Sequence, residues 1–156
     1  MGVIKIVTKA EHEDFLRKKS REVTEITPRI ITLLDDMIET MRAANGCGLA
    51  AVQVGVLRRI VVIETPEGLF ELINPVIIKK SGCQESAEGC LSVPGEWGLT
   101  KRPNKVTVEA TNRDGERYQL TGEGLLAKAI CHEVDHLDGI LYTDKVIKML
   151  GADEVE

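Results

Sequence analysis

The segment at residues 123–137 constrains the fold most, because it predicts a helix that is apolar around most of its circumference. At about 100° per residue, one stripe of this helix carries two of the chain's three histidines, and a second apolar stripe with Glu133 lies beside it. Such a helix is mostly buried. The rest of the chain must therefore pack around it, with two imidazoles on its inner surface. Thr121 is the expected cap and Gly139 the expected stop.

A second helix is predicted at residues 27–46. Thr27 can cap it, Pro28 suits its first turn, and Asn45-Gly46 can end it. Its apolar residues recur at three- and four-residue steps, so one face packs inward. We interpret it as a packing helix.

Strand-like runs fill the middle of the chain and predict two hairpins. The first spans residues 58–78 around the turn 65–68, and the second spans residues 105–121 around an Asp-Gly turn. The order helix, strands, helix predicts an α+β fold, with antiparallel sheets packed around a C-terminal metal-binding helix and an N-terminal packing helix. Residues 1–150 form a single domain in this interpretation, followed by a short acidic tail at residues 151–156, with at most a short helix near the end.

Composition excludes several classes of function. A chain of 156 residues with a net charge of −5 is unlike a protein with a large nucleic-acid or membrane-binding surface. No apolar run approaches the roughly 18 residues that a membrane helix needs, and the N-terminal stretch lacks a signal-peptide pattern. We therefore expect a cytoplasmic protein whose four cysteines are thiols or metal ligands.

The pattern His-Glu-x-x-His in the last helix indicates a metal site. His132 and His136 are one turn apart and can reach one divalent ion, while Glu133 points beside them, as a general base would. Two buried imidazoles without partners would be unfavourable, which weakens the alternative of a chance pattern on a packing helix.

A third protein ligand is required, and the sequence leaves its identity open. A glycine follows at the metzincin spacing, but Tyr142 stands where that pattern has its third histidine. The downstream carboxylates Glu154 and Glu156 lie in the acidic tail. Among upstream residues, Cys90 and Cys47 are equally good candidates, since both sit in glycine-containing turns.

Three segments in order, GCGLAAVQ at 46–53, EGCLS at 88–92 and HEVDHL at 132–137, resemble the signature motifs of peptide deformylases. The resemblance implies that Cys90, His132 and His136 bind the metal and that Glu133 is the general acid and base. It also implies that Gln53 and the backbone N–H of Leu91 donate to the oxyanion.

The resemblance further implies the reaction and its partners. It predicts removal of the formyl group from N-formylmethionine on a nascent chain, with Fe²⁺ as the native ion and Zn²⁺, Ni²⁺ or Co²⁺ as substitutes. A monomer in transient contact with the ribosome is expected, without stable binding to nucleic acid or membrane.

Several residues are expected to form the substrate pocket. Two lie on the histidine stripe of the last helix and suit an unbranched apolar side chain. The glycines of the first two motifs allow a peptide backbone to approach and to add to the strand-like LAAVQV segment. The candidate substrate-binding residues are Gly46, Gly48, Leu49, Gly89, Leu125 and Ala129.

Other charged and aromatic residues are assigned supporting roles. Glu88 and Arg102 are expected to pair as a structural brace, and Asp135 and the backbone are candidates for holding the outer imidazole nitrogens. Lys128 is expected to point away from the histidine stripe. Trp97, the only tryptophan, is assigned to packing or to a pocket rim.

Two alternatives stand beside the deformylase interpretation. A zinc endopeptidase of the His-Glu-x-x-His type would need an extended cleft and a further ligand. A noncatalytic module would use four closed protein ligands around a structural metal.

Overall fold

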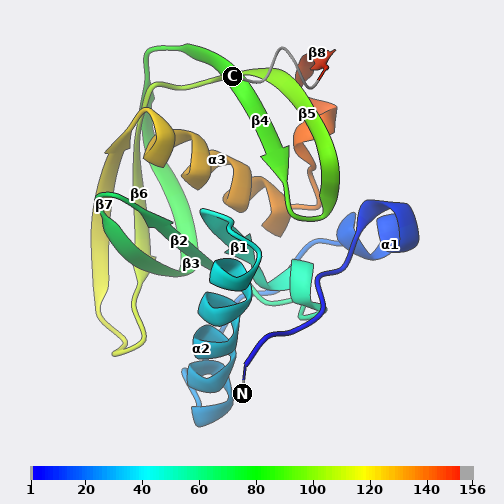
Figure 1. Cartoon of the computed structure of the whole chain (residues 1–156). Helices are drawn as coiled ribbons and strands as arrows, with labels where there is room; N and C mark the ends of the chain where they lie inside the picture. Colours follow the sequence, from blue (N-terminus) through cyan, green and yellow to red (C-terminus); the bar gives the residue numbers. More distant parts are fainter. Residues whose placement is uncertain (1, 152–156) are drawn as a thin grey trace.

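The computed structural model describes residues 2–151 and confirms the expected α+β fold. Two antiparallel sheets lie on either side of a helix near the C-terminus, and a second long helix packs on the opposite side of the larger sheet (Figure 1). Apart from Gly151, the expected acidic tail lies outside the described residues.

The larger sheet has five strands, and its centre is buried on both faces. Both expected hairpins are confirmed, because Thr65 pairs with Gly68 in one and Thr111 with Arg117 in the other. The apolar run at residues 60–63 places alternate side chains in two separate cores, one on each face. In spatial order the strands are β1 (Gly48–Ala50), β2 (Ile60–Thr65), β3 (Gly68–Ser81), β6 (Lys105–Thr111) and β7 (Arg117–Glu123).

The smaller sheet was not predicted by the hydrophobic pattern. It consists of β4 (Gln84–Cys90), β5 (Val93–Arg102) and β8 (Val146–Leu150), in that order. Residues 146–150, in the region where at most a short helix was expected, form a strand that pairs with β5. β4 and β5 are rich in Gly and charged residues and β8 is short, so period-two alternation of apolar residues is weak in them.

The packing helix near the start of the chain is confirmed as α2 (Pro28–Ala43). The Thr27 hydroxyl accepts a hydrogen bond from the N–H of Ile30, and Leu34, Met37 and Met41 are fully buried. A shorter helix, α1 (Lys9–Leu16), precedes it and was not predicted, since only Leu16 is buried in it and its backbone is non-helical at His12.

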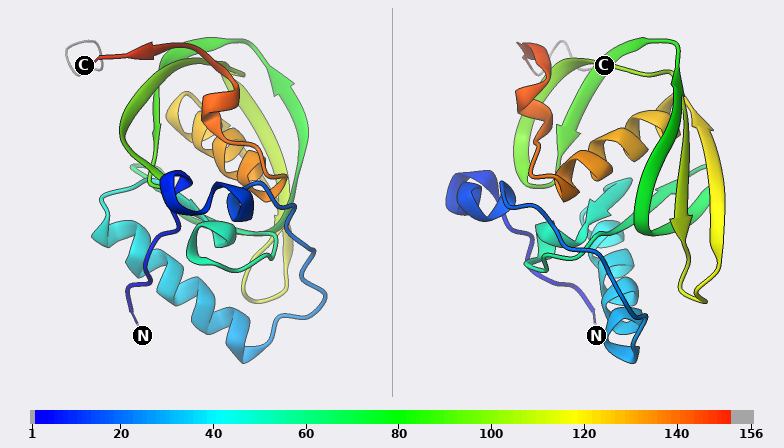
Figure 2. Two further views of the ribbon diagram at one scale, coloured as in Figure 1. Left: turned by 90° about the vertical axis from the view of Figure 1, so that its right-hand side faces the viewer. Right: turned by 180° about the vertical axis from the view of Figure 1, so that it is seen from behind.

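The histidine-bearing helix is α3 (Leu125–Leu137), and it is buried as expected. Its predicted cap is wrong, because Thr121 belongs to β7 and its hydroxyl bonds to that of Thr107. The cap position is Gly124, whose positive φ turns the chain sharply from strand into helix. Figure 2 shows from two further directions how the sheets and the N-terminal segment surround α3.

The C-terminal end of α3 is fixed by several contacts with other parts of the chain. The backbone N–H of Ser20 and the guanidinium of Arg59 both donate to the carbonyl of Leu137. Gly139 then turns the chain at a φ of +77°, into the short helical turn η2 (Tyr142–Asp144). A second such turn, η1 (Ala51–Val54), follows β1. Among the described residues, no helix has the length and apolar character needed to cross a membrane.

Replacing Gly139 by Ala should destabilise the fold strongly. A Cβ there would lie 2.1 Å from the carbonyl oxygen of Arg17, in addition to the strain of a positive φ. We expect the free energy of unfolding to fall by about 3–5 kcal/mol, measured by urea denaturation.

Gly115→Ala is the matched control, because Gly115 also has a positive φ but open space around it. It should cost only the conformational strain, roughly 1–2 kcal/mol. Equal losses in the two variants would show that the contact with Arg17 is unimportant.

Candidate active site

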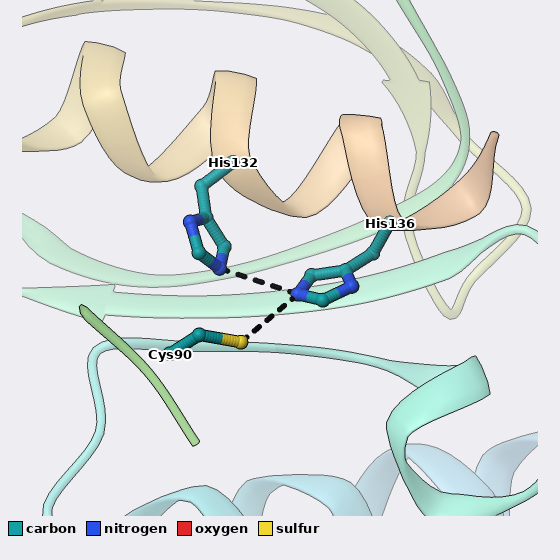
Figure 3. Close-up of side chains that lie close together, drawn as sticks. All are labelled: Cys90, His132 and His136. Atoms are coloured by element: carbon teal, nitrogen blue, oxygen red, sulfur yellow. Dashed lines mark hydrogen bonds between the residues drawn. The ribbon is translucent and has the colours of Figure 1, made fainter. Parts of the chain in front are cut away.

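Three side chains from distant parts of the sequence converge beside α3. Cys90 comes from the end of β4, and His132 and His136 come from successive turns of the helix (Figure 3). The Nε2 atom of His136 lies 3.2 Å from the Cys90 sulfur and 3.2 Å from Nε2 of His132. All three potential ligand atoms lie within 4.8 Å of one another. The structure thus brings Cys90 to the histidines and leaves Cys47 out of the cluster.

These three atoms fit a divalent metal ion. Ligands about 2.0–2.3 Å from a tetrahedral ion are themselves about 3.4–3.6 Å apart, close to the distances in the cluster. Burial lowers the pKa of His136, so its imidazole is neutral, as metal ligation requires. Three protein ligands leave a fourth position open, which is typical of a catalytic site.

The outer nitrogen of His132 is held by Glu88. A carboxylate oxygen of Glu88 contacts Nδ1 of His132, so Nε2 is the nitrogen that faces the cluster. Asp135 and the backbone were the candidates for this role, and among the described residues neither holds Nδ1 of His132. Nδ1 of His136 is buried and has no hydrogen-bond partner among residues 2–151.

A buried ion pair supports Glu88, and it confirms the expected brace. Arg102 donates two hydrogen bonds to the carboxylate of Glu88, at 3.1 and 2.7 Å, and a third at 2.8 Å to Asp135. Burial alone would raise the pKa of Glu88, but the hydrogen bonds from His132 and Arg102 hold it well below its usual range. Glu88 therefore remains ionised and accepts the N–H of the imidazole.

Glu133 lies beside the cluster without joining it. Its carboxylate is 4.0 Å from Nε2 of His132, and its Oε1 atom has no hydrogen-bond partner among the described residues. Burial raises the pKa of Glu133 to about 7, a value suited to a group that both accepts and releases a proton. A Cβ at Gly48 would lie 2.6 Å from this carboxylate, so the glycine makes room for it.

The side-chain amide of Gln53 reaches the cluster from η1. Its Nε2 atom contacts the Cys90 sulfur at 3.6 Å and the Ser92 hydroxyl at 3.1 Å, while its oxygen accepts from the N–H of Ala50. The N–H of Ser92 also points to the Cys90 sulfur, at 3.4 Å. Ser92 was not singled out from the sequence, where it reads as an ordinary turn residue.

A pocket of about 470 Å³ opens beside the cluster. Its walls come from α3, the β4–β5 hairpin and the turn between α2 and β1. Five of the six candidate substrate-binding residues line it, namely Gly46, Gly48, Gly89, Leu125 and Ala129. The exception is Leu49, whose side chain is fully buried in the core beneath α2.

Lys128, Cys47 and Trp97 also line the pocket, although none was among the candidate substrate-binding residues. Lys128 lines the wall, contrary to expectation, and its ammonium donates to the Ser86 hydroxyl and the Ala87 carbonyl. Cys47 lines the same pocket and is exposed at the surface, while partial desolvation raises the pKa of its thiol. Trp97 lines the pocket and is exposed, which agrees with the expected position at a pocket rim rather than in the core.

Tyr142 packs against the cluster from the segment after α3. Its ring is stacked on that of His132, with centroids 6.0 Å apart, and its hydroxyl donates to the carbonyl of Glu96 at 3.1 Å. Burial raises the pKa of Tyr142 to about 12, so the phenol is a hydrogen-bond donor at neutral pH.

Comparison with known proteins identifies the family. The family model described as polypeptide deformylase matches residues 4–150. The chain belongs to the peptide deformylase family. The peptide deformylase of Acetivibrio thermocellus is 60% identical over 144 residues, which cover 92% of this chain and 85% of the relative. The deformylase of Caldanaerobacter subterraneus is 56% identical over 141 residues, covering 90% of this chain and 89% of the relative.

Solved structures of peptide deformylases share the fold. The enzyme from Ehrlichia chaffeensis in complex with actinonin has a TM-score of 0.89 at 38% identity, covering 94% of this chain and 90% of that one. The enzyme from Thermotoga maritima has a TM-score of 0.89 at 33% identity, covering 94% and 99%. Members of this family use a divalent metal, in agreement with the Cys90, His132 and His136 cluster.

Replacing Glu88 by Gln should weaken metal binding. An amide has no charge to hold Arg102 and supports the imidazole of His132 less well. We expect Zn²⁺ affinity to fall about 10- to 100-fold, measured by competition with a chelator.

Glu85→Gln, an exposed change on the same strand, should leave that affinity unchanged. Circular dichroism should show a folded protein for both variants. Wild-type affinity in Glu88→Gln would show that Glu88 does not position the imidazole.

Proposed function

We propose that the chain, as a single catalytic domain over residues 1–150, hydrolyses the formyl amide of N-formylmethionine at the start of newly made polypeptides. The observation that carries this proposal is the Cys90, His132 and His136 cluster, with the Glu133 carboxylate beside it and an apolar-walled pocket next to it. Membership of the deformylase family supports the same reaction.

Cys90, His132 and His136 would hold the ion. When bound, a divalent metal supplies Lewis acidity, which polarises a carbonyl and makes a water more acidic. We propose Fe²⁺ as the native ion, with Zn²⁺, Ni²⁺ or Co²⁺ as substitutes, since thiolate and imidazole suit several of these metals. Anaerobic purification with elemental analysis distinguishes them.

Glu133 moves the proton in this mechanism. Its carboxylate accepts a proton from the attacking water and then gives it to the nitrogen of the leaving amine, so that formate and a free N-terminus result. A buried carboxylate whose pKa is about 7 serves both transfers near neutral pH. The unpartnered Oε1 atom is available for the water.

Gln53 and the backbone N–H of Leu91 are proposed to stabilise the negative charge that develops on the formyl oxygen. The Nε2 atom of Gln53 lies next to Cys90, and Leu91 follows Cys90 directly in the β4–β5 turn. Donors fixed in advance in this way lower the barrier without reorganising during the reaction. The bond of Gln53 to Ser92 and its acceptance from Ala50 hold the amide in place.

The methionine side chain is proposed to occupy the pocket. Leu125 and Ala129 line the α3 wall, two turns and one turn before His132 respectively. Gly46, Gly48 and Gly89 line the other walls, and the backbone of Leu49 belongs to the edge strand β1. A peptide could add to this free edge, consistent with strand addition.

The setting of the reaction is also a proposal. A nascent chain as substrate implies a cytoplasmic monomer in transient contact with the ribosome. The composition, with a net charge of −5, supports the absence of stable nucleic-acid or membrane binding.

Glu133→Ala should abolish turnover while keeping the metal, because Glu133 is not among the ligand atoms of the cluster. We expect the rate of formate release from formyl-Met-Ala-Ser to fall about 10²- to 10⁴-fold. Elemental analysis should give the same metal content as the wild type.

Glu96→Ala is the matched control, since Glu96 is another carboxylate of the pocket that stays exposed to solvent. It should retain activity. Loss of metal with Glu133→Ala, or cleavage of an internal bond in an unformylated peptide by the wild type, would contradict the proposal.

A further inference from the structure

Two large apolar side chains at the mouth of the pocket are exposed, although the proposed chemistry uses neither for proton transfer or metal binding. Trp97 on β5 is 41% exposed, and Leu125 at the start of α3 is 46% exposed. Both line the pocket that opens beside the cluster. Exposed apolar surface of this kind, at a concave site, is typical of a binding surface.

The backbone under Trp97 is fixed on both sides. In the smaller sheet Trp97 pairs with Leu150 of β8, and the next residue, Gly98, pairs with Glu88 of β4. The preceding carbonyl, that of Glu96, accepts the hydroxyl of Tyr142. Figure 1 shows β4 and β5 side by side, next to α3. The indole therefore stands on a rigid element rather than on a loose loop.

The indole ring itself rests on a glycine that adjoins the metal cluster. A Cβ at Gly89 would lie 2.6, 2.7 and 3.0 Å from three atoms of the ring, so only glycine lets the ring lie there. Gly89 directly precedes Cys90. The ring is thus seated on the strand that delivers the cysteine, one residue from the cluster.

The position of the Trp97 indole determines which residues of a bound peptide it can contact. With the formyl group at the cluster and the methionine side chain inside the pocket, the following residues must leave through the mouth. Trp97 and Leu125 are the large exposed apolar side chains among the described residues that line this pocket. The ammonium of Lys128 is already engaged by Ser86 and Ala87, so the apolar pair is left to contact the peptide.

Resting on the proposed function, we infer that Trp97 is a specificity-determining residue. Its ring binds an apolar or aromatic side chain in the residues that follow the formylated methionine. Aromatic pairs and the burial of apolar area both favour such a contact over one with a small polar side chain. The chain therefore processes formylated peptides with apolar second and third residues more efficiently than those with polar ones.

Steady-state kinetics on two peptides tests this inference. For formyl-Met-Phe-Phe, Trp97→Ala should lower kcat/KM about 3- to 10-fold, mainly through a higher KM. For formyl-Met-Ser-Ser the same variant should change kcat/KM less than about 2-fold. Trp97→Phe keeps an aromatic ring on Gly89 and should retain most of the preference. An equal loss on both peptides, or no loss on either, would overturn the inference.

Ile147→Ala is the matched control, because Ile147 is 55% exposed on β8 of the same sheet but does not line the pocket. It should leave both kinetic constants unchanged for both peptides. A selective loss on formyl-Met-Phe-Phe in this variant would overturn the assignment to Trp97.

Fluorescence gives a readout that does not depend on turnover or on removing the ring. Trp97 is the only tryptophan, so the protein's tryptophan emission reports its surroundings directly. In metal-loaded Glu133→Ala protein, formyl-Met-Phe-Phe should shift the emission to shorter wavelength, and formyl-Met-Ser-Ser should shift it less. Unchanged emission at peptide concentrations well above the wild-type KM would contradict the inference.

The two proposals fail in different ways. If the wild type releases no formate from formyl-Met-Ala-Ser, the proposed function is wrong. If it releases formate but shows no Trp97-dependent preference between the two test peptides, only the specificity assignment is wrong.

Discussion

The hydrogen bond between Glu88 and His132 connects the two parts of the structure on which the site depends. Glu88 belongs to the smaller sheet and His132 to the buried helix, so this contact fixes the sheet against the helix and the imidazole against the cluster. A buried carboxylate is unfavourable unless it is paired, and Arg102 supplies the compensating charge from the neighbouring strand. Arg102 also bonds Asp135, so one guanidinium ties β5 to both β4 and α3.

Close approach of backbone and side chains then shapes the pocket. Gly48 leaves space for the Glu133 carboxylate, Gly46 for the Leu91 side chain, and Gly89 for the indole of Trp97. A Cβ at any of the three would lie less than 3.0 Å from its neighbour, so a larger residue would displace the side chain that now lies there. The glycines of the first two motifs are therefore required by packing, which is independent of the proposal that a peptide backbone lies along them.

The sequence was most informative where periodicity is strong. In residues 27–46 and 123–137 the apolar residues recur at helical spacing, so α2 and α3 were predictable. The two hairpins of the larger sheet have clear turn sequences, so its main strands were predictable as well. The smaller sheet was not, because its stability comes from Glu88, Arg102 and glycine contacts rather than from an apolar stripe. For the same reason the sequence offered Asp135 and the backbone as candidates for holding an outer imidazole nitrogen, whereas Glu88, distant in sequence, holds that of His132. Leu49 was assigned to the substrate from its motif, but strand alternation turns its side chain into the core.

Tyr142 occupies the position at which the metzincin pattern has its third histidine. In the metzincin pattern a glycine after the second histidine returns the chain so that a third histidine reaches the metal. Here Gly139 also returns the chain, and Tyr142 packs its ring on that of His132 instead. The third place is taken by Cys90 from β4, so the smaller sheet becomes part of the cluster rather than a cover over it. Because the Tyr142 hydroxyl also holds the carbonyl before Trp97, the same residue connects the imidazole with the strand at the pocket mouth. The smaller sheet therefore carries both the cysteine of the cluster and Trp97 of the pocket, and the contact of Glu88 with His132 fixes it to α3.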